Sequence, residues 1–229
     1  MSEPVGVGVF ASGGGTNLQA LIDHLDPEIA RVVLVLSDRA DARALQRGRA
    51  AGARAIVVPV ADRPVAAVAD EMIDALRAAG VRLIALAGFI RKVPEDVVRR
   101  WSGRILNVHP ALLPGFGGKG MYGPRVHAAV LEAGARVTGV TVHLVDEEYD
   151  RGPILAQWPV PVLARDTPET LAARVLQVEH LLYPAVVEAA AQAYLRGDDV
   201  ASISWRAPAA WASAGEPDRQ GIRATLGLA

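Results

Sequence analysis

An asparagine and a histidine two positions apart carry the side chains most suited to chemistry in this sequence. Asn107 and His109 close a short apolar run that extends from Arg104 to Val108, and Pro110 follows directly. In an extended strand, alternate residues point to the same face. An amide can hold an oxyanion and an imidazole can move a proton, so the pair suits acyl transfer. The alternative is a structural pair, in which Asn107 satisfies a turn and His109 covers the strand end.

A glycine-rich segment near the start of the chain suits an anion. The apolar run from Val5 to Phe10 leads into Ser12-Gly-Gly-Gly-Thr-Asn17, and a helix is expected from Leu18 onward. Free backbone N–H groups and the helix dipole favour an anion at such a point. The segment has neither the lysine of a P-loop nor the GxGxxG spacing, which favours one phosphate monoester over a triphosphate or a dinucleotide. A plain glycine turn capped by Thr16 or Asn17 is the alternative.

Two carboxylates lie where they can assist these groups. Asp150 belongs to an acidic segment between two β-prone runs, 136–145 and 153–162, which predict a β-hairpin with a functional loop at its tip. There Asp150 can orient His109 and raise the pKa of its imidazole. Glu179 falls in a helix expected to start at Thr167, and it can bind sugar hydroxyls if it faces a cleft. The alternatives are a solvated hairpin tip and a surface glutamate.

The elements that position these residues alternate between strands and helices. Apolar runs at 5–10, 31–36, 54–58, 83–87 and 104–108 predict strands, and segments 42–51 and 65–79 predict helices between them. This pattern predicts an α/β fold of the Rossmann-like kind, a mostly parallel sheet with helices on both faces. Ligands bind beyond the carboxyl ends of such strands, so the glycine segment and His109 share one edge. A glycine-rich loop at 114–123 is expected to be a lid or an ordinary connection.

The chain is expected to form one domain over residues 1–197. The composition changes after Gly197, and residues 198–229 are expected to be a C-terminal extension with an edge strand over 200–205 and an irregular tail.

The composition excludes several classes of function. The formal net charge is -1, which gives no overall attraction to nucleic acid or to an anionic membrane. Cysteine is absent and the five histidines lack metal-binding spacing, so neither disulfides nor a metal is expected. No segment reaches a membrane-spanning length. We expect a cytoplasmic protein with small-molecule substrates and without nucleic acid or membrane partners. The question of whether it forms a homodimer stays open.

Five segments together resemble a known family. They are 12–19, 87–91, 106–114, 138–143 and 150–154. Their order and spacing are similar to those of the phosphoribosylglycinamide formyltransferases, over roughly residues 5 to 195. The resemblance implies transfer of a formyl group from 10-formyltetrahydrofolate to the amine of N1-(5-phospho-D-ribosyl)glycinamide, a step of purine synthesis, without a metal.

The resemblance also implies roles for single residues. The catalytic set would be Asn107, His109 and Asp150, with His143 in support. The phosphate and ribose of the ribonucleotide would be held by Gly15, Thr16, Asn17 and Glu179. The folate would be bound by Asn107, Ile90, Arg91, Lys92, Val93 and, by a weaker alignment, Arg63.

Two alternative functions stay open. One is another 10-formyltetrahydrofolate-dependent formyltransferase or hydrolase of the same superfamily. Methionyl-tRNA formyltransferase would need a further basic domain, and a deformylase would need an N-terminal regulatory domain; neither is expected here. The other is a non-catalytic folate- or nucleotide-binding module. Its mark would be the loss of Asn107, His109 or Asp150, and all three are present.

Overall fold

Seven strands form one sheet in the part of the chain that the structure describes. The structure is a computed structural model, and it describes residues 3–203, 222–223, 226 and 228. The strand order is β3-β2-β1-β4-β5-β6-β7. The strands are β1 Val5–Phe10, β2 Ala30–Ser37, β3 Arg54–Val57, β4 Val81–Leu86, β5 Ile105–His109, β6 Val137–Leu144 and β7 Ile154–Pro161. β1 to β5 pair in parallel, whereas β6 and β7 are antiparallel and form the predicted hairpin.

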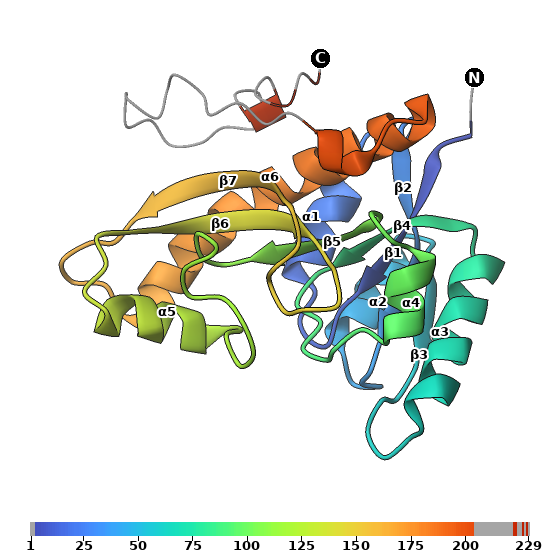
Figure 1. Cartoon of the computed structure of the whole chain (residues 1–229), viewed down its shortest axis with the longest axis horizontal. Coiled ribbons are helices and arrows are strands. Elements are labelled where there is room, and N and C mark those ends of the chain that lie inside the picture. The colour runs from blue at the N-terminus through green and yellow to red at the C-terminus, as the bar shows by residue number, and fades with distance from the viewer. Residues whose placement is uncertain (1–2, 204–221, 224–225, 227, 229) are drawn as a thin grey trace.

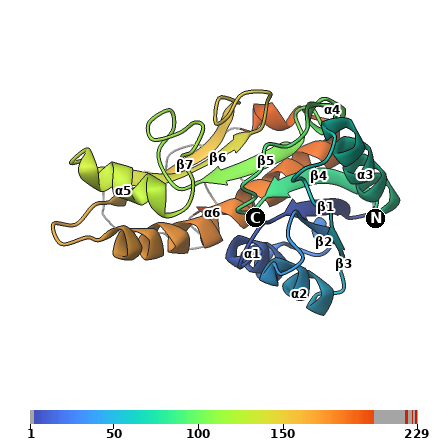
Figure 2. The same ribbon diagram turned by 90° about the horizontal axis from the view of Figure 1, so that it is seen from below.

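Helices cover both faces of this sheet, which confirms the predicted fold class. They are α1 Thr16–His24, α2 Arg43–Ala50, α3 Val65–Ala78, α4 Glu95–Arg100, α5 Pro124–Glu132 and α6 Pro168–Arg196. One buried cluster contains apolar side chains of α1, α2 and α6, and a second cluster contains those of α3 and α4. Figures 1 and 2 show α1 and α2 on the opposite side of the sheet from α3 and α4.

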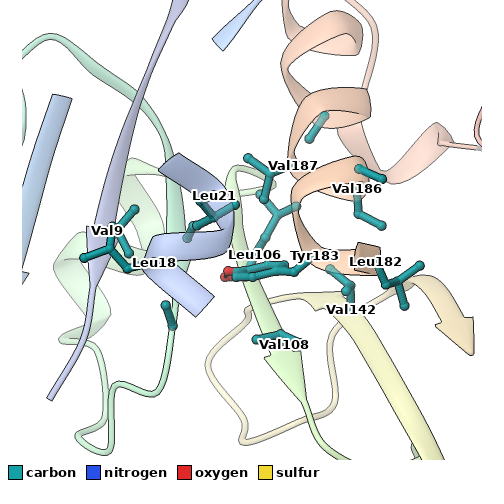
Figure 3. Packing of buried hydrophobic residues seen from close by; sticks show 14 of the residues in the cluster. Val9, Leu18, Leu21, Leu106, Val108, Val142, Leu182, Tyr183, Val186 and Val187 are labelled. Atoms are coloured by element: carbon teal, nitrogen blue, oxygen red, sulfur yellow. Dashed lines mark hydrogen bonds between the residues drawn. The ribbon is translucent and has the colours of Figure 1, made fainter. Parts of the chain in front are cut away.

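The long helix α6 begins as the sequence predicts. Thr167 is its N-cap, Pro168 occupies the first turn, and Thr167 and Thr170 exchange backbone-to-side-chain hydrogen bonds of 2.9 and 3.3 Å. The same helix carries Tyr183, which is fully buried among side chains of α1, β5 and β6 (Figure 3). The Tyr183 hydroxyl lies 3.0 Å from the carbonyl oxygens of both Leu86 and Leu106. Helix α6 therefore contacts the ends of β4 and β5, directly before Asn107.

The sheet register assembles the chemistry at one edge. Leu86, the last residue of β4, pairs with Asn107 of β5. On the other side of β5, Asn107 pairs with His143 of β6. The carboxyl ends of β1, β4 and β5 thus lie at the same edge, as predicted for a parallel sheet.

Three local features differ from what the sequence indicates. Gly15, not Thr16 or Asn17, is the N-cap of α1, because its left-handed backbone (φ 71°) starts the helix two residues early. Helix α4 was not predicted, although Glu95 and Asp96 in its first turn and arginines in its last suit a helix dipole. Val200–Ser202 form a 3-10 helix, so the edge strand is wrong over these residues, and Trp205 lies outside the described residues.

Candidate active site

A cavity of about 630 Å³ lies at the carboxyl edge of the sheet. Five of the residues predicted for catalysis and for binding the ribonucleotide line it from four different segments: Asn17, Asn107, His109, Asp150 and Glu179. The predicted acyl-transfer residues and two of the residues predicted to bind the ribonucleotide, Asn17 and Glu179, therefore line one space. Among the described residues no group of three or more potential metal ligands occurs.

His143 links Asn107 to Asp150. Its Nδ1 lies 2.8 Å from the Leu144 carbonyl oxygen, which can only accept, so Nδ1 carries a hydrogen. Its Nε2 lies 3.1 Å from Asn107 Nδ2 and 3.5 Å from Asp150 Oδ1. In the neutral ring Nε2 accepts from the Asn107 amide, which fixes the amide with its nitrogen toward His143.

His109 is held between a carbonyl and a carboxylate. Its Nε2 lies 2.9 Å from the Phe116 carbonyl oxygen, so Nε2 donates. Its Nδ1 faces Asp150 Oδ2 at 3.8 Å. The ring is only 3% exposed. Asp150 is thus placed to stabilise an imidazolium at Nδ1, while the other ring nitrogen keeps a hydrogen to donate.

Asp150 raises the pKa of His109 as predicted, but burial has the larger effect and the net pKa is lowered. Burial lowers the pKa of His109 below 6.5, and the opposing effects of Asp150 and of the Phe116 carbonyl do not restore it. The sequence indicated the charge of Asp150 but not the depth at which the ring is enclosed. Burial also favours the neutral form of Asp150, yet the nearby His143 ring, the hydrogen bond from the Gly118 N–H and the charge of His109 together bring the pKa of Asp150 below its usual value. Asp150 is therefore ionised at neutral pH.

The glycine-rich loop after β5 contacts this group directly. The Gly118 N–H donates to Asp150 Oδ2 at 2.7 Å, and the same loop supplies the Phe116 carbonyl to His109. A Cβ on Gly117 would meet Leu113 Cδ2 at 2.4 Å and Asp150 Cβ at 3.3 Å. The loop is therefore a wall of the site, and it reaches His109 and Asp150 through its main chain.

The segment between β1 and α1 presents free backbone donors. Within the described part of the chain, the N–H groups of residues 13–17 donate no hydrogen bond. Arg47 of α2 holds this segment with two hydrogen bonds. Its Nε donates to the Gly14 carbonyl at 3.0 Å, and its Nη1 donates to Gln19 Oε1 at 2.9 Å. Asn17 lines the cavity, whereas Gly15 and Thr16 do not.

Asn17 and Glu179 meet across the start of α1. Asn17 Nδ2 donates to Glu179 Oε2 at 2.5 Å, and the two residues are 9% and 8% exposed. Burial raises the pKa of Glu179, and the Asn17 bond opposes this. Asn17 Oδ1 is buried without a partner among the described residues. The contact holds a carboxylate at the cavity wall that faces the glycine segment.

Besides Asn107, four consecutive residues of the predicted folate set line the cavity: Ile90, Arg91, Lys92 and Val93. The Ile90 N–H donates to Ser12 Oγ at 3.1 Å, which joins this segment to the glycine segment. Arg91 Nε pairs with the buried Asp38 at 3.1 Å, and Lys92 pairs with Glu95 at 3.4 Å. Arg63 is not among the lining residues: it pairs with Glu71 at 2.7 Å.

Sequence reasoning missed contacts made by the main chain and by Arg47. The Phe116 carbonyl and the Gly118 N–H carry no side-chain signal, so only the glycine content of their loop pointed to them. Arg47 is one of several arginines on a short helix. The signal available for Arg47 was its place in the helix, three residues after buried Ala44 and next to buried Gly48.

Comparisons with known proteins show which family the chain belongs to. Residues 6–187 match the formyl transferase family. Phosphoribosylglycinamide formyltransferase of Bacillus subtilis is 37% identical over 183 residues, which cover 79% of this chain and 91% of that protein. The chloroplastic phosphoribosylglycinamide formyltransferase of Arabidopsis thaliana is 47% identical over 185 residues, 79% of this chain and 63% of that protein.

A solved structure has the same fold. Glycinamide ribonucleotide transformylase 1 from Symbiobacterium toebii superposes with a TM-score of 0.77 at 40% identity, covering 84% of this chain and 90% of that one. The chain spans about three fifths of the length of the two plant relatives that it matches, at 63% and 59%. By its sequence and its fold, the chain belongs to the formyl transferase family, among the phosphoribosylglycinamide formyltransferases.

Proposed function

We propose that this protein transfers the formyl group of 10-formyltetrahydrofolate to the amine of N1-(5-phospho-D-ribosyl)glycinamide, in purine synthesis. The observation that carries the proposal is the single cavity shared by Asn107, His109 and Asp150 on one side and by Asn17 and Glu179 on the other. An acyl-transfer group beside a sugar-phosphate site fits an amine acceptor that carries a ribose phosphate.

The reaction exchanges one carbon–nitrogen bond for another. The amine nitrogen bonds to the formyl carbon, the bond from that carbon to folate N10 breaks, and one proton passes from the amine to N10. The Asn107 amide and the His109 Nε2–H are the donors proposed for the oxyanion. His109 is the proposed proton carrier, because ionised Asp150 faces its Nδ1 at 3.8 Å and stabilises the charged ring.

The Phe116 carbonyl already accepts the hydrogen bond from the His109 Nε2–H. We therefore propose that this loop moves aside when the substrates bind. A glycine-rich loop can change its backbone conformation because glycine has no Cβ, and Gly118, Gly120 and Gly123 already have positive φ. The displaced carbonyl would then be replaced by the oxyanion as the acceptor for Nε2–H.

The two substrates are proposed to occupy different parts of the cavity. The free N–H groups at Gly15, Thr16 and Asn17 would bind the phosphate, and Glu179 would accept from the ribose hydroxyls. Ile90, Arg91, Lys92 and Val93, with Asn107, would contact the folate. Arg63 would lie toward the glutamate tail of the folate, outside the cavity lining.

The remaining assignments are also proposals. We propose that residues 1–197 form the catalytic domain and residues 198–229 an extension. We also propose that the protein acts in the cytoplasm on small molecules. The question of whether it forms a homodimer stays open. Two plant relatives are named as chloroplastic proteins. None of the helices in the described ranges has the length and apolar content to span a membrane.

A spectrophotometric assay tests the reaction. Wild-type protein is incubated with a 10-formyl folate, with and without the ribonucleotide, and in the absence of ATP. We expect folate deformylation that requires the ribonucleotide and no ATP. Deformylation without the ribonucleotide would indicate a hydrolase, and folate binding without any turnover would indicate a binding module.

A further inference from the structure

His127 is a buried residue of the cavity that the proposed reaction does not use. Helix α5 carries it, its side chain lines the cavity, and the residue is 4% exposed. Its Nδ1 is buried and has no hydrogen-bond partner among the described residues. Because the ring borders the cavity and Nδ1 is enclosed, Nε2 is the ring nitrogen that is open to the cavity.

The enclosed nitrogen decides which tautomer the ring adopts. A buried N–H without a partner is rarer and more costly than a buried lone pair without one. The neutral ring therefore keeps its hydrogen on Nε2. Burial, and then the charge of His109, lower the pKa of His127, so the ring is uncharged at neutral pH. His127 thus presents one neutral donor to the cavity.

The position of this donor limits what can accept from it. His127 lies close enough to His109 for the charge of one ring to act on the other, and Glu179 lines the same cavity. In the proposed complex, the reacting amine lies at His109 and the ribose lies at Glu179. The amide between them has one hydrogen-bond acceptor, its carbonyl oxygen, and a neutral donor suits a neutral carbonyl.

We infer that His127 donates from Nε2 to the amide carbonyl oxygen of the glycinamide and so selects an amide-bearing ribonucleotide. This inference rests on the proposed function. It makes His127 a determinant of substrate binding on the acceptor side, with no contact to the folate.

Two substitutions distinguish the effect of losing the N–H donor from the effect of changing the volume of the ring. His127→Gln keeps an N–H donor near the position of Nε2, and His127→Phe keeps a flat ring without a donor. His180→Phe on α6 is the matched control, because His180 does not line the cavity and also has a buried ring nitrogen without a partner among the described residues. Thermal unfolding of each variant checks that it folds, and His127→Gln keeps the test valid if His127→Phe does not.

The measurement is steady-state kinetics with the ribonucleotide and the folate varied in turn. We expect His127→Phe to raise KM for the ribonucleotide about tenfold, the effect of one lost hydrogen bond that leaves a carbonyl unpaired. KM for the folate should stay within twofold, and His127→Gln should restore most of the loss. Unchanged KM for the ribonucleotide in His127→Phe, or an equal loss in His127→Gln, would overturn the inference.

Inhibition by ribose 5-phosphate tests the acceptor atom, since this molecule lacks the glycinamide. Its inhibition constant should be the same in wild type and His127→Phe, and a weaker constant in the variant would place His127 on the ribose or phosphate instead. An inactive wild type would contradict the proposed function, whereas an active wild type with an unaffected variant contradicts only this inference.

Discussion

Burial and charge act in opposite directions on His109. Enclosure of the ring lowers the pKa, and Asp150 at 3.8 Å raises it without cancelling the effect of burial. A neutral ring can accept a proton near pH 7, which a ring with a strongly raised pKa could not do. Asp150 then matters most after the proton has arrived, because it stabilises the charged ring.

Asp150→Asn tests this balance. Removal of the charge removes an effect that raises the pKa of His109, so the pKa should fall further below 6.5. The rate of formyl transfer should fall by about 10²–10⁴-fold, with KM for both substrates little changed. NMR titration of the His109 ring gives the pKa, and single-turnover assays give the rate.

Asp146→Asn is the control, because Asp146 lies in the same loop and, among the residues that the structure describes, its side chain accepts only from the Glu148 N–H. It should change neither the pKa of His109 nor the rate by more than a few-fold. A pKa of His109 that rises in Asp150→Asn would show that Asp150 does not act on the ring through its charge.

At the scale of elements, the start of α1 is shaped by how closely α2 approaches it. Gly15 has φ 71°, and a Cβ there would lie 2.8 Å from Ala44 Cα and Cβ. Gly13 has open space around it and no positive φ. The same loop therefore offers one glycine that the fold requires and one that it does not.

Gly15→Ala should lower the free energy of unfolding by about 1–2 kcal/mol from its backbone conformation alone. It should also raise KM for the ribonucleotide, because the contact with Ala44 displaces the N–H groups at Thr16 and Asn17. Urea unfolding and steady-state kinetics measure the two effects. Gly13→Ala should leave both near wild type, and equal effects in the two variants would argue against a precise phosphate loop.

The order of elements could be predicted from the sequence, because each strand is marked by an apolar run and most helices end at a glycine. The capping of α6 by Thr167 and the β6–β7 hairpin were predictable for the same local reasons. The Asn107–His109 pair was predictable from the alternation of a strand, and Asp150 was predictable from the acidic segment between two β-prone runs.

What could not be predicted depends on contacts between distant segments. The lowered pKa of His109 follows from the burial of its ring in the folded protein, and the pairing of Arg63 with Glu71 follows from the turn before α3. The Asn17–Glu179 bond joins residues 162 positions apart. Local sequence patterns contain no information on such distances.

At the scale of the whole molecule, the C-terminal residues that the structure describes pack against α6. Ile222 and Leu228 are buried in the same cluster as side chains of α6. Arg223 Nη1 lies 2.7 Å from Glu188 Oε2, and the Glu188 side chain is 1% exposed. This contact attaches the extension to the helix that also carries Glu179 and Tyr183.

Arg223→Ala should lower the free energy of unfolding by about 3 kcal/mol, because it leaves the buried Glu188 carboxylate without its cation. Urea unfolding measures the change, and the double variant Glu188→Gln with Arg223→Ala should recover part of it. A loss below about 0.5 kcal/mol, the size of an exposed ion pair, would show that the extension does not stabilise α6.

The most direct test of the central claim, that His109 carries the proton in an otherwise intact site, is single-turnover formyl transfer by His109→Ala with binding of both substrates measured in parallel. The account predicts that the ribonucleotide and the folate bind within a few-fold of wild type while transfer slows by about 10²–10⁴-fold. Transfer within tenfold of wild type, with both substrates bound, would contradict it.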